Sequence, residues 1–152
     1  MPKDPRGPAL RDATSPSEEM YLITVAVAEE DGRPAPWPLA GLAEALGISP
    51  ISANQMVRRL ADRGLVEYHP YRGVSLTPRG RRAARRVLRG RRLWATFLVE
   101  HLGFTPGEAD ALACSLEHVT PPAAADRLAR YLGDPAVEPL GRVIPPAAGG
   151  RA

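Results

Sequence analysis

The sequence predicts a mainly α-helical protein in which an N-terminal winged helix-turn-helix precedes an α-helical domain. The first observation is a recurring helix-start signal, a hydroxyl residue followed by proline, which suits the N-cap and first position of a helix. It occurs at Ser15-Pro16, Ser49-Pro50, Thr77-Pro78 and Thr105-Pro106. The second is one pair of short alternating segments, 65–68 and 74–76, around the turn at residues 70–73. One hairpin within a run of helices is typical of a winged helix.

The first expected helix begins after Ser15, which forms a capping box with Glu18, and ends near Glu30. The turn between the second and third helices needs a small residue at the crossing and one that tolerates positive φ, and Ala43 and Gly47 supply these. The later helices are expected to span about 39–46, 50–63, 78–102, 106–118 and 122–132. Apolar side chains expected to pack between the first three helices are Leu42, Leu46, Ile48, Ala53, Met56 and Leu60.

Composition excludes several classes of protein. No stretch approaches the roughly 18 uncharged apolar residues of a membrane helix, and residues 1–11 lack a signal-peptide core. We therefore expect a cytoplasmic protein with no membrane partner and with disordered tails at residues 1–14 and 146–152. The single cysteine, Cys114, excludes an internal disulfide. The three histidines lie on different expected elements and no nucleophile-elbow or phosphate-loop motif occurs, so we do not expect an enzyme.

Positive charge is concentrated in one segment of the chain. The whole sequence has a net charge of +3, whereas residues 58–92 contain twelve arginines against Asp62 and Glu67, a local net charge of +10. Such clustering indicates a polyanionic partner, although a solvated charged helix face is the alternative explanation.

The third expected helix turns a polar face outward beside this basic segment. Asn and Gln can pair bidentately with adenine, Arg with guanine or phosphate, an apolar side chain with the thymine methyl, and a helix N-terminus with phosphate. The candidate DNA-binding residues are Ser49, Ile51, Ser52, Asn54, Gln55, Arg58 and Arg59 on the helix and Arg72 on the wing. For any one of them an ordinary solvated surface is the alternative, but the combined set predicts contact with double-stranded DNA.

Several segments resemble the diphtheria toxin repressor-like (DtxR-like) family of metal-dependent transcriptional regulators, which includes the manganese transport regulators. They occur in family order and at family spacing, and the similarity covers roughly Ser17 to Pro145. These segments are Glu19-Met20-Tyr21-Leu22, Ala43-Glu44-Ala45-Leu46, Ser49-Pro50-Ile51-Ser52, Tyr71-Arg72-Gly73-Val74-Ser75-Leu76-Thr77, Cys114-Ser115-Leu116-Glu117-His118-Val119 and Pro139-Leu140-Gly141-Arg142-Val143-Ile144-Pro145.

The resemblance implies a repressor that binds operator DNA as a homodimer with a divalent metal co-repressor, iron(II) or manganese(II). It divides the chain into a winged helix-turn-helix DNA-binding domain at 15–76 and a helical dimerization and metal-binding domain at 77–145. From the resemblance we expect the two-domain form of the family, without its SH3-like domain.

The spacing of three residues is compatible with a metal site even when the family is left aside. Cys114, Glu117 and His118 are spaced i, i+3 and i+4, which places a thiolate, a carboxylate and an imidazole on one helical face. The resemblance adds Met20 as a ligand from the first helix. Sulfur donors favour iron(II), with manganese(II) second. The alternatives are that Met20 fills the core, Cys114 is a small buried apolar residue, and Glu117 and His118 form a surface pair.

The family's second, ancillary metal site is not preserved. Its positions correspond to Arg91, Ala95 and Asp110, and the Arg91 cation can pair with Asp110 or Glu117 instead. We therefore expect at most one functional ion per subunit. The alternative functions are a metal-independent winged-helix regulator and a redox sensor that uses Cys114.

Overall fold

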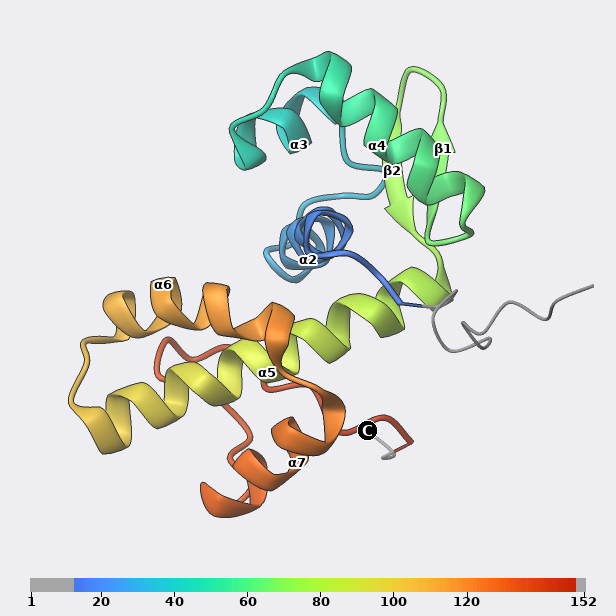
Figure 1. Ribbon diagram of the computed structural model, residues 1–152. Helices are drawn as coiled ribbons and strands as arrows, with labels where there is room; N and C mark the ends of the chain where they lie inside the picture. The colour runs from blue at the N-terminus through green and yellow to red at the C-terminus, as the bar shows by residue number, and fades with distance from the viewer. Residues whose placement is uncertain (1–12, 150–152) are drawn as a thin grey trace, which may run out of the picture.

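The computed structural model describes residues 13–149 and contains six α-helices and one two-stranded sheet in that range (Figure 1). In chain order the elements are α2 (Pro16–Glu30), α3 (Leu39–Leu46), α4 (Pro50–Asp62), β1 (Val66–His69), β2 (Gly73–Leu76), α5 (Pro78–Leu102), α6 (Pro106–Leu116), the 3-10 helix η1 (Glu117–Val119) and α7 (Pro122–Tyr131). The predicted fold class is confirmed. The expected tails fall mostly on residues 1–12 and 150–152, outside the described residues.

Capping side chains define where the helices begin. Ser15 accepts a hydrogen bond from the Glu18 amide while the Glu18 carboxylate accepts one from the Ser15 amide, which completes the predicted capping box. Ser49 and Thr77 cap α4 and α5 in the same way with their hydroxyl oxygens. Gly47 ends α3 with φ 64°, as the turn between the two helices requires. The helix-turn-helix therefore forms from local signals that the sequence carries.

The end of α6 differs from the sequence-based expectation. A helix was expected to reach about His118, but α6 ends at Leu116, and Glu117 and His118 lie in the 3-10 helix η1. Proline at positions 121 and 122 cannot donate helical hydrogen bonds and disfavours the helical conformation just before it. The chain therefore tightens and turns at Thr120, whose backbone is extended, before α7 begins.

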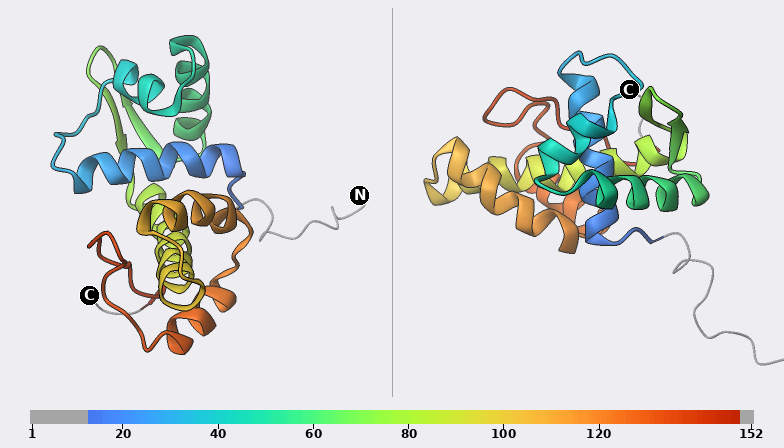
Figure 2. Two further views of the ribbon diagram at one scale, coloured as in Figure 1. Left: turned by 90° about the vertical axis from the view of Figure 1, so that its left-hand side faces the viewer. Right: turned by 90° about the horizontal axis from the view of Figure 1, so that it is seen from above.

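Helix α2 lies between two layers of the molecule (Figures 1 and 2). On one side are α3, α4 and the wing, and on the other are α5, α6 and α7. The main core joins α2 to α4, the wing and the first half of α5, and Leu22, Leu42, Leu60 and Val74 are fully buried in it. Two smaller apolar clusters hold α6 and α7 against the second half of α5. None of the described helices is long and apolar enough to span a bilayer.

The wing is anchored by Trp37, whose place beside it was not predicted from the sequence. Strands β1 and β2 pair antiparallel with Val66 opposite Leu76, and Trp37 forms a β-bridge to Val74 through backbone hydrogen bonds of 2.8 and 2.9 Å. Gly73 has φ 126°, and a Cβ atom there would lie 2.0 Å from the Trp37 carbonyl oxygen. The bridge therefore depends on glycine at this position.

Two buried glycines of α5 give opposite predictions. A Cβ atom at Gly80 would lie 1.8 Å from the Leu65 carbonyl oxygen, whereas one at Gly90 would make ordinary contacts of 3.5 and 3.6 Å with Thr120. We predict that Gly80→Ala lowers the free energy of unfolding by about 3 kcal/mol, because backbone must move. Gly90→Ala should raise it by about 0.5–1 kcal/mol, because alanine favours the helix. Urea denaturation measures both, and equal effects would contradict the packing of α5 against the wing.

Candidate functional site

The structure places the predicted DNA-binding residues at the surface of α4 and the wing. Ala53, Val57 and Leu60 turn inward and are buried, while the opposite face of α4 is exposed, with Ile51 at 72% exposure. Ser49, Ser52, Gln55, Arg58 and Arg59 are also exposed, Asn54 is partly exposed, and Arg72 is exposed in the turn of the wing. Figure 1 shows α4 and the wing side by side at the end of the molecule away from α5.

Most of these side chains already have partners within the chain. Ser49 caps α4 and donates a hydrogen bond to the Ser52 hydroxyl at 2.9 Å. Nε of Arg58 donates a hydrogen bond of 3.3 Å to the side-chain amide oxygen of Asn54. Nε of Arg59 lies 3.6 Å from the Glu18 carboxylate. Within residues 13–149, the side chains of Gln55 and Arg72 make no hydrogen bond or ion pair. These two side chains need to break no internal contact in order to meet a ligand.

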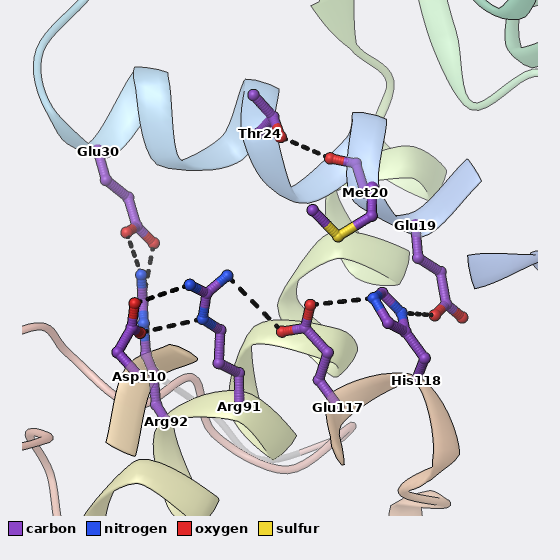
Figure 3. A network of polar contacts seen from close by, with 9 residues as sticks. All are labelled: Glu19, Met20, Thr24, Glu30, Arg91, Arg92, Asp110, Glu117 and His118. Carbon is purple, nitrogen blue, oxygen red and sulfur yellow. Dashed lines mark hydrogen bonds and ion pairs between the residues drawn. The ribbon is translucent and has the colours of Figure 1, made fainter. Parts of the chain in front are cut away.

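The four candidate metal ligands come from α2 and from the layer of α5, α6 and α7 on one side of it. Met20 projects from α2, and Glu117 and His118 lie in η1 (Figure 3). Cys114 lies near the end of α6. Nε2 of His118 lies 3.1 Å from Oε1 of Glu117. The Glu117 side chain is fully buried, yet neither of its carboxylate oxygens has a hydrogen-bond partner among the described residues. Burial of a charged carboxylate without hydrogen bonds is unfavourable in free energy, and a nearby cation reduces that penalty.

The electrostatics of these groups also favour a cation. Burial raises the pKa of Glu117 to about 7, and burial together with the neighbouring Glu117 raises the pKa of the Cys114 thiol. In the part of the chain that the structure describes, no three His, Cys, Asp or Glu side chains form a ready-made metal-binding group. The donor types fit a transition metal, but the side chains are not gathered around one point. Helix α6 ends at Leu116, so Glu117 and His118 do not continue the helical face that carries Cys114.

An ion pair joins two of the residues that the family resemblance places at an ancillary metal site. Arg91 binds Asp110 through two hydrogen bonds of 3.0 and 2.8 Å, and its Nη1 lies 3.9 Å from Oε2 of Glu117. Burial opposes ionisation of Asp110, but the Arg91 guanidinium outweighs it and holds the pKa of Asp110 below its ordinary value. Ala95 is buried and offers no donor. Of the two partners expected for Arg91, Asp110 is the principal one.

Comparison with known proteins assigns both halves of the chain. Residues 13–74 match the family described as "Iron dependent repressor, N-terminal DNA binding domain", and residues 77–146 match "Iron dependent repressor, metal binding and dimerisation domain". The chain belongs to the iron-dependent repressor family.

Named relatives agree with this assignment. The iron-dependent repressor IdeR of Mycobacterium tuberculosis is 38% identical over 128 residues, covering 84% of this chain and 54% of that protein. An uncharacterized HTH-type transcriptional regulator of Methanocaldococcus jannaschii is 34% identical over 115 residues, covering 76% and 87%. A solved structure titled "Manganese-dependent transcriptional repressor complex with manganese" superposes with a TM-score of 0.75 at 36% identity, covering 86% and 59%. The chain spans about half the length of the curated iron-dependent repressors it matches.

Two neighbouring carboxylates near the candidate metal ligands, Glu18 and Glu19, were not identified as site residues from the sequence. Glu19 is buried on α2, and its Oε2 lies 2.7 Å from Nδ1 of His118, whereas Glu18 accepts a 2.5 Å hydrogen bond from Arg63 at the end of α4. Paired acidic residues in the first turn of a helix resemble ordinary compensation of the helix dipole. The available signal for Glu19 was its position beside Met20.

Arg91 should stabilise the α5–α6 packing without any ion. We predict that Arg91→Met lowers the free energy of unfolding by about 2 kcal/mol, because the partly buried Asp110 carboxylate and the buried Glu117 carboxylate lose a neighbouring cation. The matched control is Arg85→Met, an exposed arginine of the same helix, which should change stability by less than about 0.5 kcal/mol. Chemical denaturation in the presence of a chelator measures both, and equal stabilities of the two variants would contradict this role.

Proposed function

We propose that this protein is a metal-dependent transcriptional repressor that binds operator DNA as a homodimer, with one divalent ion per subunit as co-repressor. The principal supporting observation is the buried Glu117 carboxylate, which has no hydrogen-bond donor among the described residues and lies beside His118 at the contact between α2 and η1. The proposed role is regulatory, involves no catalysis and belongs in the cytoplasm.

The proposed DNA contacts follow from the outer face of α4. Asn54 and Gln55 would pair with base edges, Arg58, Arg59 and Arg72 with phosphate or guanine, and Ile51 with a thymine methyl. The exposed amides after Ser49, together with the Ser49 and Ser52 hydroxyls, would hold a phosphate at the helix N-terminus. Asn54 would release its hydrogen bond to Arg58 on binding. These contacts combine positioning on the backbone with sequence readout.

The proposed metal centre consists of Met20, Cys114, Glu117 and His118. Iron(II) is the favoured ion and manganese(II) the second, because thioether and thiolate donors suit the softer cation. A bound divalent ion supplies a positive charge that draws the four side chains toward one point. Met20 would contribute from α2 and the other three from α6 and η1, so the centre would hold the two layers together. The Arg91 and Asp110 pair occupies the ancillary position and supports a limit of one ion.

Exposed apolar side chains support the homodimer. Leu102, Phe104 and Leu112 lie on the α5–α6 hairpin with exposures of 57%, 37% and 40%. Large apolar side chains at this density on a helical hairpin are suited to burial against a second subunit. They belong to the segment that matches the metal-binding and dimerisation domain.

A metal-independent regulator is the second candidate, and the absence of a ready-made ligand group within residues 13–149 favours it. A Cys114 redox sensor is less well supported, because a raised thiol pKa reduces the reactive thiolate.

We predict that Gln55→Ala and Asn54→Ala each weaken binding to a selected operator by roughly 5- to 100-fold while leaving random duplex binding nearly unchanged. Arg72→Ala should weaken both, because a phosphate contact carries no sequence information. Fluorescence anisotropy at fixed salt measures these affinities, with the operator obtained by selection from random duplexes. Arg130→Ala, an exposed arginine on α7, is the control and should leave both affinities unchanged. Equal losses on operator and random DNA for all three variants would refute these base contacts.

The metal requirement separates the two candidate functions. We predict that iron(II), and more weakly manganese(II), tightens operator binding relative to the same protein with chelator, at one ion per subunit. Cys114→Ser and Met20→Leu should weaken iron(II) binding and shift the operator response to higher metal concentration, because each removes a sulfur donor. Operator affinity that is the same in chelator and in every first-row metal would establish the metal-independent regulator. Two tight ions per subunit would contradict the role given to Arg91.

A further inference from the structure

The imidazole of His118 lies between two buried carboxylates. Its Nδ1 is 2.7 Å from Oε2 of Glu19, and its Nε2 is 3.1 Å from Oε1 of Glu117 (Figure 3). Glu19 belongs to α2 and lies 99 residues before His118 in the sequence. Both side chains of this long-range contact are largely buried, with exposures of 12% for His118 and 11% for Glu19. The contact therefore lies within the junction of the two layers and is not a surface pair.

The chemistry of Glu19 determines which nitrogen of His118 carries hydrogen. An ionised carboxylate only accepts hydrogen bonds, so Nδ1 must donate its N–H to Glu19. The neutral imidazole then has its lone pair on Nε2, the nitrogen that faces Glu117. Glu19 is itself held in place, because its other oxygen accepts a 2.9 Å hydrogen bond from the Thr14 hydroxyl. Glu19 therefore keeps hydrogen on Nδ1 and fixes the orientation of the ring, so that Nε2 is the nitrogen that can give its lone pair to a cation.

We propose that Glu19 is a positioning residue of the metal centre, which holds His118 with Nε2 directed toward the ion. This inference rests on the proposed function, because it assigns His118 as a ligand. A carboxylate on the far nitrogen of a ligating histidine fixes the ring and raises its basicity, and its loss weakens metal affinity by roughly 10- to 100-fold. The buried Glu117 carboxylate without a hydrogen-bond donor marks the side of the ring where the ion would bind. Glu19 thus acts on the metal through His118 and not by coordination.

A second ion pair on α2 supplies a matched control. Glu30 lies at the other end of the helix and binds the buried Arg92 of α5 through hydrogen bonds of 2.5 and 3.2 Å. Like Glu19, Glu30 joins α2 to the layer of α5, α6 and α7, called here the helical layer. Unlike Glu19, it has no contact with the candidate ligands. A purely structural role for Glu19 would make the two residues equivalent, whereas a positioning role would not.

The test is a cobalt(II) titration of the full chain, followed by absorbance, for wild type, Glu19→Ala, Glu19→Gln and Glu30→Ala. We expect Glu19→Ala to raise the cobalt(II) Kd roughly 10- to 100-fold. Glu19→Gln should restore part of the affinity, because its amide oxygen still accepts from Nδ1. Glu30→Ala should keep the wild-type Kd. Nitrogen-15 NMR of metal-free protein, recorded at a pH at which the imidazole is neutral and with the His118 signals assigned from His118→Gln, should show the Nδ1–H tautomer in wild type and Glu30→Ala and a tautomer mixture in Glu19→Ala.

Three outcomes would overturn the inference. A wild-type cobalt(II) Kd in Glu19→Ala, with wild type binding normally, refutes the positioning role and leaves the proposed metal centre intact. An equal loss in Glu30→Ala reduces Glu19 to a structural contact between the layers. Failure of wild type itself to bind cobalt(II), iron(II) or manganese(II) refutes the metal centre and this inference together.

Discussion

The organisation of the molecule depends on the packing of α2 between two layers. Its apolar side chains Leu22, Ile23 and Val25 are buried in the core shared with α4, the wing and α5. Its acidic side chains reach in both directions, because Glu18 binds Arg63 of α4 while Glu19 and Glu30 bind His118 and Arg92 of the helical layer. Helix α2 therefore contacts both α4, which carries the candidate DNA contacts, and the layer of α5, α6 and α7 (Figure 2).

Arginine supplies fixed positive charge throughout the helical layer. Arg92 is 3% exposed and joins Glu30 to the Val143 carbonyl oxygen, and Arg89 joins Asp126 to the Pro145 carbonyl oxygen. Arg91 does the same for Asp110. A guanidinium is permanently charged and satisfies several acceptors at once, so these contacts hold at any metal concentration. Glu117 differs from Asp110 and Asp126, because its arginine neighbour, Nη1 of Arg91, is 3.9 Å away and makes no hydrogen bond to it.

Local signals in the sequence predicted the helices well, whereas long-range contacts were largely beyond them. The Ser15 and Thr77 caps gave the starts of α2 and α5, and Gly47 gave the turn after α3, because capping acts within one turn. The Trp37 bridge to the wing and the Glu19 contact with His118 join residues distant in sequence and have no periodic pattern. The surface-pair alternative for Glu117 and His118 is wrong, because Glu117 is fully buried. The sequence predicted that Arg91 would pair with Asp110 or with Glu117, because both carry the opposite charge. The structure shows hydrogen bonds between Arg91 and Asp110.

Among the described residues, Glu117 alone has two buried side-chain polar atoms without a hydrogen-bond partner, whereas Glu18, Glu29, Arg89 and Arg92 each have one. Buried unsatisfied polar groups concentrate at functional sites. The position of Glu117 connects it with the packing of α2. Under the proposed function, the ligand set is complete only when Met20 of α2 meets the three donors of α6 and η1. Ion binding and one particular docking of α2 then favour each other, and the coupling is reciprocal by thermodynamic necessity. Operator DNA that selects the same docking through α4 must accordingly raise the affinity of the protein for its metal.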